Sequence, residues 1–435
     1  MGVMDKELDR KLKQFFNHLA DRPLEPTDHA YVPFLEEGSD AVDPISALAK
    51  RISWSEAASV SLLSGQRGTG KSTELRRLRK ILSDDDCVVF FCDMRDYMNL
   101  TTPVEISDFL ISIMSGLGDA VNDLFQRDLA KETLWTRLFN FLETEVQVKD
   151  IKIGVDAGMA KGEFVASLRD DPTFRSELQQ HLRGHVARLV KQAHQFASEV
   201  VDFVRERKNN PDQKVVLIVD SVEQIRGVGS DAANVYKSVE NLFSGHAESL
   251  HIPKLHVVYT IPPYLTPLVP NLGQLFGGNA LCNLPSIHVR RRNGDSDKSG
   301  LDIMTRIIEN RESGWPQFFA REHLDRLALS AGGDIRGFFY LIKDCLVRAS
   351  SMKEAKLPVP HQILTNAENQ LRREMLPLPA EDVIWLKRIT ATKQPELDTI
   401  KELPHLARFF DTRVVINYRN DVDWYDVHPL LIDTL

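Results

Sequence analysis

The sequence predicts an α/β fold in which a parallel β-sheet is followed by a helical segment and a small C-terminal module of helices and strands. Three patterns support this prediction. A glycine-rich turn at 65–72 stands between a strand-like run and a run with helical spacing. Continuous apolar runs, typical of strands buried on both faces, alternate with helical patterns at 87–92, 215–220 and 255–260. The pattern becomes helical after about residue 295 and mixed after Pro377.

The glycine-rich turn is a complete G-x-x-x-x-G-K-[ST] phosphate-binding loop. Its residues are Gly65, Gln66, Arg67, Gly68, Thr69, Gly70, Lys71 and Ser72, with Thr73 continuing into the helix. The glycines let the backbone wrap closely around phosphate oxygens, and the helix N-terminus favours an anion. Lys71 would reach the β- and γ-phosphates, and the Ser72 hydroxyl would ligate Mg²⁺. The motif predicts a P-loop NTPase fold that binds ATP or ADP with Mg²⁺.

Composition limits the class of protein. The chain has 435 residues and a formal net charge of -8, which argues against broad coating of nucleic acid or of an anionic membrane. No apolar run approaches the length of a membrane span, and the N-terminus lacks a signal-peptide core. The four cysteines lack paired C-x-x-C spacing. We therefore expect a cytoplasmic protein with free thiols and no membrane partner.

The first 50 residues predict a helix with Leu8, Leu12 and Phe15 on one face, followed by an aromatic and aliphatic stretch. In many P-loop ATPases the segment ahead of the first strand contacts adenine. Tyr31, Val32 and Pro33, with Phe34, are therefore candidates for the base pocket. Plain core packing of the same residues is an equal alternative.

Two insertions and the last strand complete the predicted core. Residues 146–165 contain alternating stretches broken by glycines and predict an inserted hairpin. Asp171-Pro172 starts three-to-four spacing that continues to the stop at Asn209-Asn210-Pro211, which predicts one long helix over 172–208. Residues 286–289 are a candidate for the last strand.

Polar residues at the ends of two predicted strands are candidates for chemistry. Asp220 follows an apolar run, as a carboxylate that orients Mg²⁺ does in P-loop NTPases. Glu223 is the nearest acidic group that could orient an attacking water, although a capping glutamate is the alternative. Thr260 ends the next strand, where it could contact the γ-phosphate or merely finish the strand.

Two features beyond the sheet are further candidates. Ala331-Gly332-Gly333-Asp334-Ile335-Arg336 predicts a tight turn between helices, and Arg336 on the first helical turn could clamp the β- and γ-phosphates, or pair locally. The pattern of residues 406–431 predicts a helix, a strand, a polar turn and a second strand. This is the order of elements at the C-terminal end of a winged helix. Its wing turn at 419–423 is acidic, which weakens DNA binding by this module.

Together these motifs resemble the AAA+/STAND branch of P-loop ATPases, in particular origin-recognition-like AAA+ ATPases and NB-ARC/NACHT-type signalling ATPases. The resemblance covers roughly residues 30–435 and implies that Glu223 acts in hydrolysis and that Arg336 is the sensor 2 arginine. It also implies that His428 contacts the ADP β-phosphate, although proline follows it where the NB-ARC motif has aspartate. No arginine occurs between Pro262 and Pro285, where an arginine finger is usual, so hydrolysis is expected to be slow.

The resulting domain prediction has four parts: an N-terminal helix and adenine-side linker at 1–50, an ATPase core at 51–292, a helical lid at 293–356 and a winged helix at 357–435. The first functional hypothesis is a nucleotide-dependent switch or assembly subunit, by analogy in a bacterial antiviral defence complex, that self-associates or works with a separate effector or sensor protein. The alternative is a DNA-associated initiator, loader or transposition ATPase, which the net charge and the acidic wing disfavour.

Overall fold

The computed structural model describes residues 6–33, 42–125, 141, 160–352, 356–395, 402–419 and 422–435. The chain divides into two compact units, each considered by itself below. The first unit contains the described residues of Met1–Asp43, Gly65–Arg77 and Leu284–Leu435. The second contains Pro44–Ser64 and the described residues of Leu78–Asn283.

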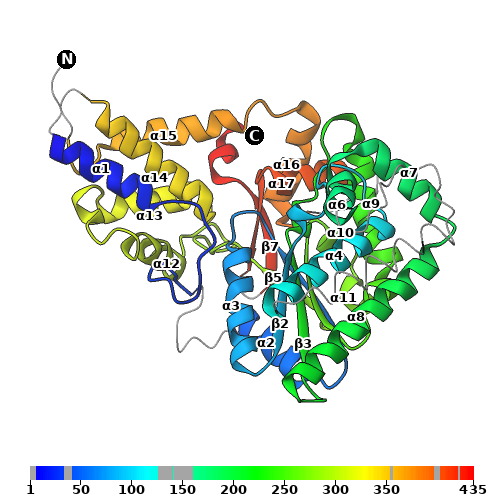
Figure 1. Cartoon of the computed structure of the whole chain (residues 1–435). Helices are drawn as coiled ribbons and strands as arrows, with labels where there is room; N and C mark the ends of the chain where they lie inside the picture. The colour runs from blue at the N-terminus through cyan, green and yellow to red at the C-terminus, as the bar shows by residue number, and fades with distance from the viewer. Residues whose placement is uncertain are drawn as a thin grey trace. The chain divides into compact units, whose positions relative to one another are not determined.

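A five-stranded β-sheet organises the second unit (Figure 1). Its strands follow the order β2-β3-β4-β1-β5, and β1 pairs with β4, β4 with β3 and β3 with β2 in parallel. The strands are β1 Val60–Gly65, β2 Val88–Asp93, β3 Val215–Asp220, β4 His256–Ile261 and β5 Leu281–Leu284. Every residue of β1, β3 and β4 is buried, which explains their continuous apolar sequences and confirms the α/β parallel-sheet prediction.

The last strand lies earlier in the sequence than the pattern predicted. β5 is Leu281–Leu284, whereas 286–289 contain no strand. The two segments are equally short and apolar, and pairing at the sheet edge decides between them.

Helices make up most of the rest of the second unit. They include α2 Pro44–Trp54, α4 Ile106–Phe125, α6 Ala160–Asp170, α7 Pro172–Leu182, α8 Val186–Lys208, α9 Ala232–Gly245, α10 Leu265–Leu268 and α11 Leu272–Leu275. The apolar helix α4 packs against β2, and α8 packs against α4. In Figure 1 both helices run beside the sheet.

The prediction of one long helix over 172–208 is wrong. Asp171 caps α7 by accepting hydrogen bonds from the amides of Thr173 and Phe174, but the helix ends at Leu182. The chain turns at 183–185, and α8 starts at Val186 and continues to Lys208. Gly184 lies in this turn, and glycine is a poor helix former. The helical spacing of the apolar residues therefore continues across a break between two helices.

The predicted hairpin at 146–165 falls mostly outside the described residues. Its last residues, 160–165, are helical and belong to α6, which corrects that part of the prediction. Phe164 and Leu168 are four residues apart and bury one helical face against Leu178 and Leu182. The signal for the helix was this spacing, which the glycine at 162 obscured.

Helices form the core of the first unit. They are α1 Lys6–His18, α12 Lys298–Glu309, α13 Arg321–Ser330, α14 Ile335–Ser350 and α15 His361–Glu374, and their apolar faces share one buried cluster. The N-terminal helix α1 packs along α14 (Figure 1), and Phe15 contacts Phe318 and Phe319 edge-on or tilted. The helix at the N-terminus is therefore part of the same core as the helices after residue 295.

The C-terminal module also belongs to the first unit. It contains α16 Ala380–Thr392 and α17 Leu403–Asp411, followed by the antiparallel strands β6 Val415–Arg419 and β7 Asp423–Val427. Helix α17 packs on β6 and α16 on β7, while Tyr418 stacks on Trp424 at 4.5 Å. A final 3-10 segment, Pro429–Thr434, packs against α13 and α15. The order of helix and hairpin agrees with the sequence pattern.

Cys87, Cys92, Cys282 and Cys345 are buried free thiols, and burial raises the pKa of Cys92 and Cys345. Among the described helices, none has both the length and the apolar character needed to cross a bilayer.

Candidate functional site

The loop 65–72 lies between β1 and helix α3 Lys71–Asp84, as the motif predicts. Gly68 and Gly70 have positive φ values of 96° and 82°, which side chains disfavour. Lys71 is buried, and its Nζ donates hydrogen bonds to the carbonyls of Gly65 and Gln66 at 2.7 and 2.8 Å. The ammonium group is therefore held inside the loop, beside the N-terminal amides of α3. This arrangement suits an anion.

The N-terminal segment holds the first turns of α3. The Leu24 amide donates to Thr73 Oγ1 at 3.1 Å, and the Tyr31 hydroxyl donates to Glu74 Oε1 at 3.0 Å. Arg77 joins the two segments, since it pairs with Glu74 and forms two hydrogen bonds with Asp43 at 2.7 and 2.8 Å. Burial raises the pKa of Tyr31, which keeps the phenol protonated as a donor.

Three of the four candidates for the base pocket have different surroundings, and Phe34 lies outside the described residues. Tyr31 is half-buried and turns its hydroxyl to α3, whereas Val32 packs in the helical core of the first unit. Pro33 is exposed. Val32 therefore has the alternative role predicted for this segment, which is core packing. Adenine contact stays a prediction for all three residues.

The glycine turn before α14 lies against the loop within the first unit. Gly332 and Gly333 have φ values of 63° and 77°, and Asp334 caps α14 by accepting from the Gly337 amide at 2.8 Å. The Cδ of Arg336 would lie 3.5 Å from a Cβ on Gly68, so the stem of this side chain reaches the loop. Its guanidinium pairs with Asp21 at 2.7 Å. Because both partners are largely exposed, this pair is weak and can exchange.

Gln66 connects the loop to the C-terminal module, a role that sequence reasoning missed. Its Nε2 donates to the Val415 carbonyl at 2.6 Å, and its Oε1 accepts from the Asn417 amide at 2.9 Å. The side chain is buried and pairs with β6 as a neighbouring strand would. An amide carries the donor and the acceptor that a strand edge requires, but nothing in the sequence identifies its partner.

His428 is buried at the end of the hairpin. Its Nδ1 accepts from the Leu430 amide at 3.3 Å, and its own amide donates to the Val414 carbonyl at 2.8 Å. Burial, followed by the charges of Arg413 and Arg290, lowers the pKa of His428 to about 3. The ring is therefore neutral and carries its proton on Nε2, which is the form that could donate to a phosphate oxygen.

The candidates on the second unit cluster at the carboxyl edge of the sheet. Asp220 is buried, and its Oδ1 accepts from the Ser221 amide at 2.7 Å. Thr260 Oγ1 accepts from the Val222 amide at 3.0 Å, which ties the end of β4 to the turn after β3. Glu223 lies in that turn, in the 3-10 segment Val222–Gln224.

Asp93 is a further carboxylate at this edge. It ends β2 and is the register neighbour of Asp220. Burial opposes its ionisation, but hydrogen bonds from Arg95 and Ser221 outweigh burial and lower its pKa. The signal was present in the sequence, because Asp93 also follows an apolar strand.

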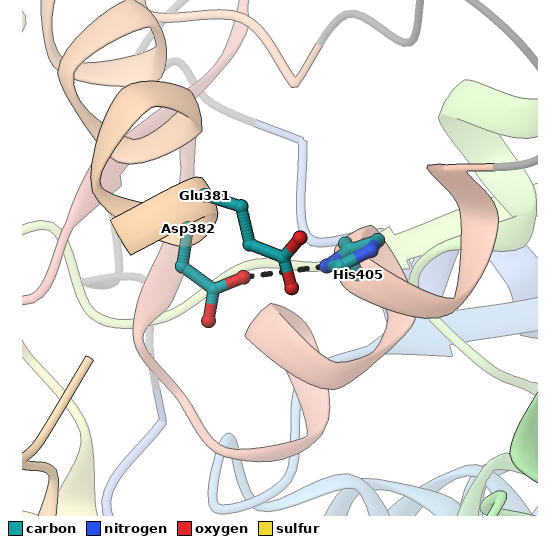
Figure 2. A group of neighbouring side chains, drawn as sticks. All are labelled: Glu381, Asp382 and His405. Carbon is teal, nitrogen blue, oxygen red and sulfur yellow. Dashed lines mark hydrogen bonds and ion pairs between the residues drawn. The ribbon is translucent and has the colours of Figure 1, made fainter. Parts of the chain in front are cut away.

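Another group of potential metal ligands lies in the C-terminal module. Glu381, Asp382 and His405 have one ligand atom each within 4.8 Å of one another (Figure 2). Arg408 donates to both carboxylate oxygens of the buried Asp382, at 2.6 and 2.7 Å. Because a guanidinium already neutralises this carboxylate, the cluster is an ion-pair network.

No family model matches the chain, and no curated protein matches it. Among solved structures, the chain is similar to the ORC2 protein of Aeropyrum pernix in ADPNP–ADP complexes, at 11% identity and a TM-score of 0.40 over 95% of this chain and 93% of that one. It is also similar to Cdc6p from Pyrobaculum aerophilum, at 12% and 0.36 over 100% and 96%. A RuvB variant of Thermotoga maritima aligns at 12% and 0.37 over 90% of each chain. At TM-scores below 0.5, similarity to these structures does not identify a function for this chain.

Proposed function

We propose that this chain binds ATP and ADP with Mg²⁺ at the loop 65–72, hydrolyses ATP slowly and uses the nucleotide as a conformational switch. The observation that carries the proposal is the loop itself. A complete phosphate-binding sequence stands between β1 and α3, with two glycines at positive φ and the ammonium of Lys71 held inside.

The proposed chemistry assigns roles to five of the candidates. Lys71 and Arg336 bind the β- and γ-phosphates, Ser72 and Asp220 hold Mg²⁺, and Glu223 orients the attacking water. The strand order supports these roles, since β4, which ends near Thr260, pairs with both β1 and β3. The carboxyl ends of parallel strands share one edge, and ligands of open α/β sheets bind there.

Two contacts support slow hydrolysis. Thr260 Oγ1 is engaged by the Val222 amide, and the Arg336 guanidinium is engaged by Asp21. The Thr260 hydroxyl donates its proton to the Val219 carbonyl at 3.4 Å, so this proton and the Arg336 guanidinium both have to change partner before they can act on a phosphate or a water. In the proposed cycle, nucleotide binding supplies the free energy for that exchange.

The switch rests on the connection between the loop and the C-terminal module. Gln66, inside the loop, hydrogen-bonds to two backbone groups of β6. A change in loop conformation on nucleotide binding would therefore strain or release the hairpin. We extend the proposal to assembly. In this extension, the released C-terminal module controls association with further copies of the chain or with a separate effector or sensor protein. A subunit of a defence complex would work in this way.

The test is nucleotide affinity of Lys71→Ala, measured by calorimetry and thermal unfolding with MgADP and a non-hydrolysable ATP analogue. Ligand at about 100 times its Kd should stabilise the wild type by about 2.7 kcal/mol. Loss of a charge-assisted hydrogen bond should weaken binding about 10-fold to 100-fold in the variant.

The matched control is Lys80→Ala, because Lys80 is on the same helix, is exposed and pairs with Asp84. It should bind nucleotide as the wild type does. Equal affinities of Lys71→Ala and wild type would overturn the proposal. The hydrolysis step is tested by measuring Mg²⁺-dependent phosphate release. The variant Glu223→Gln should abolish it.

A further inference from the structure

Arg413 lies where the C-terminal module meets the turn before α14. It occupies the turn between α17 and β6 with a φ of 61°, a conformation that arginine rarely adopts. Its Nη1 donates to Asp334 Oδ2, and the side chain is less than one-third exposed. Backbone strain of this kind persists where surrounding contacts hold it, and the Asp334 contact is one of them.

Asp334 is turned toward the phosphate-binding loop. Its Oδ1 lies where a Cβ on Gly68 would be, so the carboxylate touches the loop backbone. Oδ2 accepts from the Gly337 amide and from Arg413. Within the described residues, the buried Oδ1 has no hydrogen-bond partner. A buried carboxylate oxygen without a partner is costly, and here it points at a loop built to hold anions.

A second arginine, Arg290, lies near His428 in the C-terminal module. Arg290 is close enough to lower the pKa of His428, as Arg413 does. Its Nε is buried and has no hydrogen-bond partner in the part of the chain that the structure describes. Two guanidiniums therefore lie near His428, and one of them, Arg413, pairs with Asp334 beside the loop. A guanidinium suits the several acceptor oxygens of a phosphate.

We propose that Arg413 is a phosphate ligand supplied by the C-terminal module, and that the terminal phosphate of a bound triphosphate replaces Asp334 as its acceptor. This inference rests on the proposed nucleotide binding at the loop. A terminal phosphate near Gly68 would place a second anion beside Asp334, and the guanidinium pairs with the stronger and more numerous acceptors of the phosphate. A diphosphate lacks that group and leaves Arg413 on Asp334. The pair thus distinguishes the triphosphate from the diphosphate.

The test compares affinities for ADP and for a non-hydrolysable ATP analogue, both with Mg²⁺, in variants of the full chain. Arg413→Gln should lose about 10-fold to 100-fold in affinity for the analogue, and ADP binding should stay near the wild-type value. Asp334→Asn keeps an acceptor for the Gly337 amide but removes the competing charge. It should bind the analogue more tightly than the wild type, an effect that a purely structural role does not produce.

Arg408→Gln is the matched control, because Arg408 also pairs with a buried aspartate of the C-terminal module, Asp382. It should leave the preference between the two nucleotides unchanged. Arg413→Lys, which keeps the charge, replaces Arg413→Gln if the latter does not fold. Equal losses for both nucleotides, or no loss, overturn the role of Arg413. If the wild type binds neither nucleotide, the proposed function itself fails.

Discussion

Lys71 and His428 show how single side chains depend on their partners. The ammonium of Lys71 is buried, and the loop's own carbonyls satisfy it. His428 is buried beside two arginines and stays neutral. In both residues the type of group was evident from the sequence. The partners of both groups, and the neutral state of the His428 ring, follow from burial, which brings together segments far apart in the chain.

His428 predicts a pH dependence of stability. Its pKa is lowered from 6.5 to about 3 by burial, so the unfolded chain binds a proton that the folded chain excludes. The contribution is fully present above pH 6.5 and is lost as the pH falls toward 3. His428→Asn should reduce the slope of the unfolding free energy between pH 4.5 and 6.5 by about 1.4 kcal/mol per pH unit.

Urea unfolding at several pH values measures this slope. Asn keeps an acceptor at the cap of the last 3-10 segment, which limits other losses. His256, whose pKa burial lowers to about 4, retains its own contribution in the variant. An unchanged slope in His428→Asn would show that the ring titrates normally in the folded chain.

Local elements show where helical period and backbone geometry disagree. Helical spacing continues from 172 to 208, yet the turn at 183–185 separates α7 from α8. The two glycines at 332–333 predicted a turn. The sequence did not show why the second of these positions requires glycine. A Cβ on Gly333 would overlap the Ile287 carbonyl, whereas Gly294, also at positive φ, has open space around it.

The two glycines make a matched pair for a stability test. Gly294→Ala should cost about 1–2 kcal/mol from conformation alone. Gly333→Ala should cost about 2–5 kcal/mol, because steric overlap adds to the same conformational cost. Denaturant unfolding of both variants measures the difference. Equal losses would mean that the chain around Ile287 adjusts without cost.

At the scale of the whole molecule, the compact units do not follow the linear sequence. Gly65–Arg77, which contains the loop and the first turns of α3, groups with Met1–Asp43 and Leu284–Leu435, whereas β2, β3, β4 and most of β1 and β5 group with the rest. The predicted boundaries at 50 and 292 follow composition along the chain. The grouping of the loop with the C-terminal module follows from contacts such as those of Gln66 with β6 and of Asp334 with Arg413.

The net charge of -8 predicts weak interaction with nucleic acid. The chain should not retard a DNA duplex in a gel at low salt, with or without nucleotide. Titration of a labelled duplex at two salt concentrations measures any binding. A measurable affinity that falls steeply as salt increases would favour the DNA-associated alternative over the switch.

The sequence by itself determined strands β1 to β4, the phosphate-binding loop and the turn at 332–334, because local spacing and residue type suffice for each. Asp93 was also accessible, since it ends an apolar run as Asp220 does. Only the tertiary structure decided that Gln66 pairs with β6, that Asp334 lies on Gly68 and that Arg413 is its partner. These contacts join residues from 79 to 351 positions apart, and local propensity carries no information about which distant groups burial will bring together.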